Sequence, residues 1–505
     1  MATATEIDTS SLLTILGLIA AVWALISPTS KLRFRFCIAW FDWLIASAVF
    51  LIVHYLVFET TLKSVGLYYS LGPWRWGFDT SSAIYLLLLA TAIYFFWRTN
   101  SPKLVRGKIH IFRELTENLR LTKRYDELVL LVEPQLSKLI GIARLRGVDE
   151  RSIWQQLKFF CSSQKNASTE AREILLNLIT SPELTVHMAA AHPYFSLKLF
   201  EADNLVHSDF IEHYIEALLD VPGSRLYVEL KNNQNLNGGS RLYLLENNRL
   251  LRFFFVNASA AIDNGLDRAI GETVYRRLDE DNKLAEALNK PMGAYREVGK
   301  FRCPINSGIT LFEIMVHEGI HQGLQDHMWL HYFRHFASKI LEKMTPSPDE
   351  DNFQEWPTPF HYLLYRLVSV TTDWCKQCEH IVDAEIPDAT RSDARFDRHF
   401  ISKAATEALG DILEYVVSNE KISDHFKKYL LDIVLRSYTR AKNNTDLSDV
   451  TSSLITNIIH GSDLPRSSQY HIKLQKLFEQ SDHILRLNAE PFGEALIDAL
   501  SQIKK

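Results

Sequence analysis

Apolar positions in the first hundred residues gather into three runs, at about 12–27, 36–58 and 82–97. The second run is longer than the roughly 20 helical residues that cross a bilayer core. Ser, Thr and Trp residues flank the two shorter runs and extend them into the membrane interface. The pattern therefore predicts three transmembrane helices in a domain that covers residues 1–98.

Basic residues are concentrated on two flanks of these runs. Residues 28–35 carry three basic residues and no acidic one, and residues 98–124 carry eight basic residues against two acidic ones. Residues 1–11 contain two acidic residues and neither Lys nor Arg, unlike the start of a signal peptide. The positive-inside rule predicts a multi-pass protein of the cell (inner or plasma) membrane, with the N-terminus outside and residues 98–505 in the cytoplasm.

Asp42 lies about 9 Å into the second run by the helical rise per residue. A carboxylate at that depth has two interpretations. Either it lines a pore formed between subunits, or it reaches headgroup water at an interface that Trp40 and Trp43 mark. The second interpretation is favoured, because tryptophans are typical of the ends of membrane spans.

After residue 98 the apolar residues recur at three- and four-residue spacing, which is the period of an amphipathic helix. Leu128, Leu131 and Val132 are one example. The pattern predicts a mostly α fold, with a basic juxtamembrane segment and helical domain at 99–222 and a C-terminal helical domain at 257–505.

The segment between these two domains, residues 223–256, has a different pattern. Leu, Tyr, Val and Phe are frequent in three stretches, Arg225–Leu230, Arg241–Glu246 and Arg249–Val256. The pair Asn247-Asn248 between the last two stretches suits a tight turn. We therefore expect a small β-hairpin insertion at 223–256.

The overall composition narrows the function classes. The chain of 505 residues has 55 Lys and Arg against 60 Asp and Glu, a net charge of −5, and 47% hydrophobic residues. These values are ordinary for a folded protein and give no direct indication of nucleic-acid binding. Five cysteines are too few for a disulfide framework in so long a chain. No phosphate-binding glycine motif and no serine-hydrolase motif is present in the sequence.

The sharpest chemical motif is His317-Glu318-Gly319-Ile320-His321, which fits the pattern H-E-x-x-H. On a helix the two histidines share one face and can bind one zinc ion, while the glutamate deprotonates zinc-bound water. The surrounding stretch, Ile309 to Met344, has no proline and is predicted to be helical. Over these five residues the chain resembles the zincin metallopeptidases. The resemblance implies that His317 and His321 bind zinc and that Glu318 is the catalytic general base.

The zincin pattern also needs a further ligand. His327 stands at the offset of the third metzincin histidine, although Gly323 comes one position before the glycine of that pattern. Glu379, in Glu379-His380-Ile381-Val382-Asp383, resembles the E-x-x-x-D segment of membrane-bound zincins. Those proteases also have membrane spans on both sides of the motif, and no apolar run follows it in this sequence.

Cys375 and Cys378 form a C-x-x-C pair, and the two histidines of the motif have the spacing of structural zinc ligands. These four residues form one Cys₂His₂ zinc site that joins two helices, or the cysteines are simply buried. A further interpretation needs no metal. The two histidines, together with His331 and His335, fall on one side of a helical wheel, as in a packed or pH-sensitive interface. A catalytic zinc, a structural zinc and no metal thus remain three alternatives.

The division into a small membrane domain and a large helical body predicts an integral membrane receptor or effector. Its cytoplasmic body would bind an unidentified ligand or partner, and its membrane helices would act in the lipid as a homo-oligomer, with a pore as one form of that action. The layout is similar to that of prokaryotic membrane-damaging defence effectors, in architecture alone. The alternative is a membrane-anchored zinc metallopeptidase that uses His317, Glu318 and His321.

Overall fold

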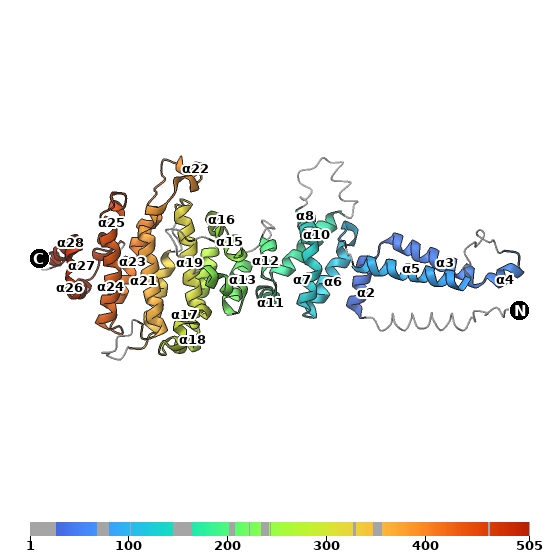
Figure 1. The fold of residues 1–505 in the computed structure, drawn as a ribbon, viewed down its shortest axis with the longest axis horizontal. Coiled ribbons are helices and arrows are strands. Elements are labelled where there is room, and N and C mark those ends of the chain that lie inside the picture. Colours follow the sequence, from blue (N-terminus) through green and yellow to red (C-terminus); the bar gives the residue numbers. More distant parts are fainter. Residues whose placement is uncertain are drawn as a thin grey trace. The chain divides into compact units, whose positions relative to one another are not determined.

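The structure is a computed structural model, and its described residues are mostly helical. No strand occurs in the described residues, which are 27–67, 80–100, 103–144, 164–200, 208–221, 223–233, 242, 244–326, 330–346, 356–462 and 465–503. The prediction of a mostly α fold is confirmed. The chain divides into two compact units, Met1–Leu184 and Thr185–Lys505, whose helices Figure 1 shows in chain order.

The first unit contains a helical hairpin of membrane type. α3 (Trp40–Val57) and α5 (Thr80–Asn100) are each long and apolar enough to cross a bilayer, and they lie side by side in Figure 1. Large apolar side chains point outward from both helices, including Leu51 at 67% exposure and Phe96 at 69%. Such exposure is unfavourable in water and favourable in lipid. Two of the three predicted spans are thus present as candidate spans, and the first, at 12–27, lies outside the described residues.

The second span begins later than the sequence predicts, because a separate helix precedes it. α2 (Pro28–Cys37) ends before α3 begins, and α4 (Glu59–Ser64) follows α3. The Lys108 ammonium donates to the carbonyl oxygen of Phe36 at 2.8 Å and to that of Ile38. These bonds satisfy carbonyl groups that the end of a helix leaves without partners.

A small helical core follows the hairpin in the first unit. Its elements are η1 (Arg106–Lys108), α6 (Ile109–Leu121), α7 (Tyr125–Val132), η2 (Glu133–Gln135), α8 (Leu136–Ala143) and α10 (Gln164–Ile179). α2 packs on α6, where the rings of Phe36 and Phe112 lie 5.1 Å apart and the Thr29 hydroxyl donates to Asn118 Oδ1 at 2.8 Å. α10 and α11 (Pro182–Ala191) are together apolar enough for one bent span, but α10 already buries its apolar face against α6 and α8.

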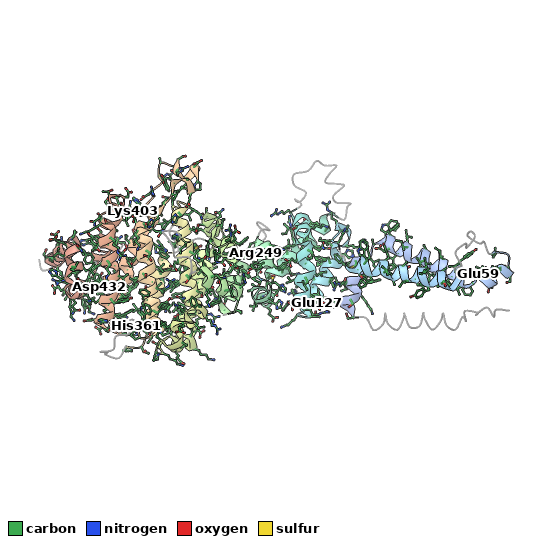
Figure 2. The ribbon with its side chains drawn as sticks, viewed as in Figure 1. Glu59, Glu127, Arg249, His361, Lys403 and Asp432 are labelled. Atoms are coloured by element: carbon green, nitrogen blue, oxygen red, sulfur yellow. The ribbon has the colours of Figure 1, made fainter. Side chains whose placement is uncertain are left out.

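The second unit is a larger helical body. Its elements are α12 (Pro193–Phe200), α13 (Ser208–Asp220), α14 (Arg225–Asn233), α15 (Arg249–Phe255), α16 (Ala258–Asp263), α17 (Leu266–Glu280), α18 (Asn282–Leu288), η5 (Gly293–Arg296), η6 (Gly299–Arg302), α19 (Pro304–His321), α20 (Leu330–Lys343), α21 (Pro359–Gln377), η7 (Cys378–His380), η8 (Asp383–Glu385), α22 (Asp388–Arg391), α23 (Phe400–Ser418), α24 (Asp424–Ala441), η9 (Thr445–Leu447), α25 (Ser448–Ile459), α26 (Ser468–Gln480), α27 (His483–Asn488) and α28 (Glu490–Ile503). Side chains fill the spaces between these helices, for example around His361 and Asp432 in Figure 2.

α19 is the central helix of the second unit. All its residues are buried except Pro304 and Glu313, as expected for a helix that is apolar on nearly every side. It crosses α17 closely at Gly308, where an added Cβ would lie 2.1 Å from Cγ2 of Val274. The H-E-x-x-H motif occupies the last turn of this buried helix.

The predicted β-hairpin at 223–256 is wrong. Two of its three stretches are helices, α14 and α15, and no strand occurs among its described residues. The predicted turn is present, because the Asn248 N–H bonds to the Leu245 carbonyl at 3.0 Å, but it leads into a helix. The buried residues of α15 recur with helical spacing, and burial of that face outweighs the strand propensity of Phe.

The prediction of continuous helix from Ile309 to Met344 is also wrong. α19 ends at His321, and Gly323 follows with a left-handed φ of +69°. The Leu324 N–H then bonds back to the Gly319 carbonyl at 3.0 Å, as in a glycine-terminated helix. A Cβ at Gly323 would also lie 2.8 Å from Cγ2 of Ile386. The helical stripe that joined four histidines is therefore divided between α19 and α20.

Candidate functional site

Asp42 lies in the first turn of α3 and is enclosed within its own hairpin. Its Oδ2 accepts the Ala39 N–H at 2.6 Å, and its Oδ1 accepts the Tyr94 hydroxyl at 2.6 Å. The Arg98 guanidinium donates to Oδ2 at 3.2 Å. With 2% of its surface exposed, the carboxylate is buried. It ties the start of α3 to the end of α5.

His317 and His321 share one face of α19, as their spacing predicts. Their ring centroids lie 4.6 Å apart, and both side chains are buried. The Leu242 N–H donates to Nε2 of His317 at 2.9 Å, and the amide nitrogen of Gln377 donates to Nε2 of His321 at 3.1 Å. Since a metal binds through a nitrogen lone pair, a zinc ion on both Nε2 atoms would have to displace these two donors.

Glu318 is directed at the start of α16. Its Oε2 accepts the side-chain amide of Gln322 at 3.2 Å. The same amide group accepts the Ala258 N–H at 2.9 Å and donates to the Val256 carbonyl at 3.2 Å. In this arrangement Glu318 is part of a buried polar link between α19 and the α15–α16 connection.

The predicted further ligands differ in what the structure describes of them. His327 lies outside the described residues, and Glu379 is exposed in η7. A carboxylate that the sequence did not single out, Glu385, lies close by, with Oε2 at 3.8 Å from Nδ1 of His321. Within the described part of the chain, neither histidine belongs to a set of three His, Cys, Asp or Glu ligand atoms lying within 4.8 Å of one another.

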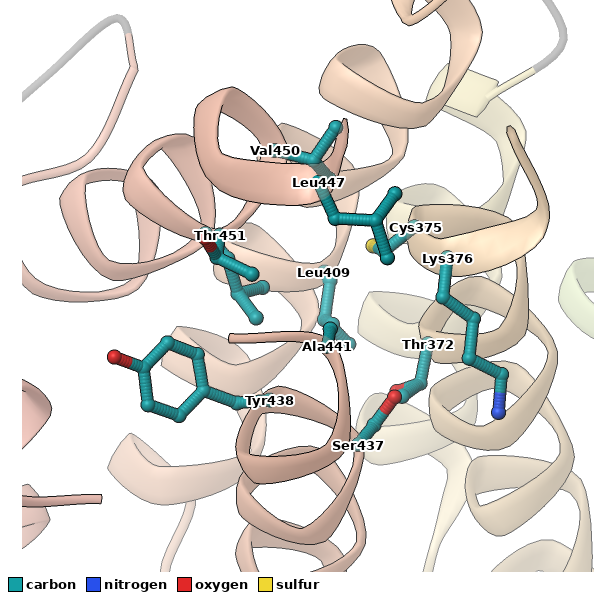
Figure 3. A pocket seen from close by; sticks show the side chains of 11 residues that line it. Thr372, Cys375, Lys376, Leu409, Ser437, Tyr438, Ala441, Leu447, Val450 and Thr451 are labelled. Carbon is teal, nitrogen blue, oxygen red and sulfur yellow. The ribbon is translucent and has the colours of Figure 1, made fainter. Parts of the chain in front are cut away.

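Cys375 and Cys378 are buried thiols. Cys375 faces an apolar gap between α21, α23, α24 and α25, where its sulfur lies beside Leu447 in Figure 3. It donates to the Thr371 carbonyl at 3.2 Å. Burial raises the pKa of both thiols, so that they stay protonated. The gap measures about 10 Å³, near the lower limit for one water molecule, and has no room for a ligand.

A much larger cleft lies between α17 and α20. It measures about 610 Å³, within the range of small-molecule sites. Three carboxylates line it, those of Asp267, Glu272 and Asp326, together with Tyr275 and His335. The cleft is therefore a candidate binding site in the described part of the second unit.

The Tyr332 ring forms a fixed wall of this cleft. It packs on Gly271, where an added Cβ would lie 2.5 Å from three ring atoms, so only glycine permits this approach. The Phe312 ring lies 5.8 Å away, and the Tyr332 hydroxyl donates to Glu272 Oε1 at 3.0 Å. Close packing and a hydrogen bond thus hold the ring in one position.

The charged groups of the cleft act on one another. Burial raises the pKa of Asp267, and the negative charge of Asp326 adds to this rise. Burial also lowers the pKa of His335, which keeps this imidazole neutral at pH 7. Beyond Tyr275, the Lys339 ammonium lies 5.6 Å from the Tyr275 ring centroid and pairs with Asp279 at 2.8 Å.

Neither a protein-family model nor a curated protein matches the chain. Sequence reasoning missed Gln377 and Glu385 beside the histidines, and it missed the cleft. The i, i+4 spacing of His331 and His335 was visible, but it was assigned to the wrong helix. The acidic wall on α17 gave no motif, because its residues form a site only when α20 packs beside them.

Proposed function

We propose that the protein is an integral membrane receptor or effector, whose helical second unit binds a ligand and whose membrane helices act as a homo-oligomer. The observation that carries the proposal is the combination, in one chain, of a lipid-facing hairpin with a helical body that holds a ligand-sized cleft. Two helices, or three with the first run, enclose no pathway through a membrane, so a pore would need several copies around an axis.

The packing of the first unit supports the proposed orientation. The Asp42–Arg98 pair places the start of α3 and the end of α5 at the same end of the hairpin. α2, which carries three basic residues, packs there on α6, and Lys108 bonds to the end of α2. Both basic flanks thus lie together, as the positive-inside rule requires of one cytoplasmic surface. We propose that the N-terminus is outside and that residues 98–505 are cytoplasmic.

Membrane depolarisation tests this function. High-level expression of the full chain in a bacterial host should depolarise the membrane, because a higher concentration drives assembly by mass action. The control is a chimera in which an unrelated three-span anchor of the same topology replaces residues 1–98. We expect the chimera to leave a voltage-sensitive dye unchanged. Equal depolarisation by both proteins, or none by the full chain, would remove the effector proposal.

The second candidate, a membrane-anchored zinc metallopeptidase, is favoured by one observation, the adjacency of the two buried histidines with Glu318 and Glu385 nearby. In it, His317 and His321 would bind the ion and Glu318 would be the general base. Two results would support it. The purified chain would hold one zinc ion, which is lost in His317→Ala, and it would have peptidase activity, which is lost in Glu318→Gln. A zinc-free chain from zinc-supplemented medium would exclude it, and release by Cys375→Ser would indicate a structural site.

A further inference from the structure

We infer that the cleft between α17 and α20 binds a small organic cation that carries two or more amine or guanidine groups. The inference rests on the proposed receptor function and names the class of its ligand. Three features of the cleft support it: the charge of its walls, the spacing of its carboxylates and its aromatic surface.

The walls carry more negative than positive charge. Asp267, Glu272 and Asp326 line the cleft against one guanidinium, that of Arg268. Asp267 is only 9% exposed, so its charge acts in a region with little water. Its carboxylate also lies close enough to that of Asp326 for the two to repel each other. A bound cation relieves this repulsion, and charge-assisted hydrogen bonds to carboxylates are stronger than neutral ones.

The spacing of the carboxylates favours an extended organic cation over a metal ion. A divalent ion holds its oxygen ligands at about 2.0–2.6 Å, which brings the ligand atoms close to one another. No three of the His, Asp and Glu side chains that line the cleft have ligand atoms within 4.8 Å of one another, and all of these side chains are among the described residues. A chain with several charged groups can reach separate carboxylates, and a volume of about 610 Å³ accommodates it.

The aromatic surface of the cleft is also suited to a cation. The Tyr275 ring already attracts one, since Lys339 lies 5.6 Å from its centroid. Tyr332 is held against Gly271 with its hydroxyl on Glu272, so that the Glu272 carboxylate has a fixed place beside the ring. A ligand ammonium or guanidinium group between Glu272 and these rings would meet both a charge and an aromatic surface.

The test measures binding of spermidine and of agmatine to the full chain in detergent micelles by isothermal titration calorimetry. Asp267→Asn and Glu272→Gln should each weaken spermidine binding about tenfold or more, the effect of about 1.4 kcal/mol lost with one charged contact. Glu280→Gln removes an exposed carboxylate from the same helix outside the cleft, and should leave binding unchanged. Thermal unfolding of each variant checks that it folds.

Several outcomes would overturn the inference. They are no binding of either amine, equal binding by all three variants, and Mg²⁺ binding that Asp267→Asn removes while spermidine binding persists. Because calorimetry does not depend on membrane activity, its result is distinct from the depolarisation test. Amine binding without depolarisation would leave the ligand site and remove the effector function. Depolarisation without amine binding would leave the effector function and remove the ligand site.

Discussion

His361 shows how burial controls the charge of a single residue in this protein. It lies on α21 with 2% of its surface exposed, its Nδ1 is 2.9 Å from the Thr358 hydroxyl, and its ring lies 4.9 Å from that of Phe426. Burial lowers its pKa to about 4. The imidazole is therefore neutral in the folded protein at pH 7, and its proton uptake opposes folding.

The low pKa of His361 predicts a loss of stability in acid. The unfolded chain takes up this proton below about pH 6.5, whereas the folded chain does so only near pH 4. The contribution of neutral His361 to the free energy of unfolding is thus fully present above pH 6.5. It falls by about 3 kcal/mol as the pH falls to 4. His361→Asn keeps a polar atom for Thr358 and should remove that share of the acid sensitivity. Thermal unfolding in detergent between pH 4 and 7 measures the difference, and equal pH profiles for the two proteins would contradict the prediction.

At the scale of elements, one buried carboxylate joins two helices where the sequence predicts strands. Glu229 on α14 is fully buried, and its Oε2 accepts the N–H groups of Leu250 at 2.9 Å and Leu251 at 3.1 Å. These N–H groups belong to the first turn of α15, where backbone N–H groups have no acceptor within the helix. The side chain of Glu229 therefore caps the N-terminus of α15.

Removal of this cap should destabilise the second unit. Glu229→Ala leaves two buried N–H groups without an acceptor, and we expect a loss of about 2–4 kcal/mol in the free energy of unfolding. Glu229→Gln keeps one acceptor oxygen and should cost less. The matched control is Glu246→Ala, since Glu246 is exposed in the same connection. Hydrogen exchange of α15 in the full chain measures the effect, and equal protection in the Glu229→Ala and Glu246→Ala variants would refute it.

The Asp42–Arg98 pair makes a second prediction about elements. Asp42→Asn keeps the volume and one acceptor oxygen for the Ala39 N–H. It weakens the bond to Arg98, and the amide nitrogen that replaces Oδ1 no longer accepts the Tyr94 hydroxyl. Because the carboxylate is enclosed in the hairpin, any ion flux should stay near that of the wild type. Asp42→Leu leaves Arg98 and the Tyr94 hydroxyl without this acceptor, and should lower the protease resistance of the hairpin in detergent. A changed ion selectivity in Asp42→Asn would instead indicate a pore-lining carboxylate.

At the scale of the whole molecule, the proposed topology predicts which side of the membrane each flank of the helical hairpin faces. Ser64 and Ser137 are exposed, at the end of α4 and in α8. A cysteine at position 64 should react with an impermeant maleimide in intact cells, and one at position 137 only after permeabilisation. The background protein carries Cys161→Ser, and its other cysteines are buried. Labelling of position 137 from outside would reverse the topology.

The sequence alone determined the features that depend on neighbours along the chain. The two candidate spans follow from local hydropathy, because a lipid solvent acts on each segment separately. The shared face of His317 and His321 follows from helical spacing in the same way. The mostly α fold also follows, because most of the chain has a clear period of three to four residues.

The tertiary structure decided the features that depend on residues far apart in sequence. Asp42 and Tyr94 are separated by 52 positions, and Leu242 and His317 by 75, so neither bond was visible in the local pattern. Glu229 likewise reaches across 21 positions to cap α15. The cleft exists only where α20 packs on Gly271 of α17. A local pattern fixes which face of a helix is apolar, whereas the partner of each buried polar group is chosen only when the helices pack.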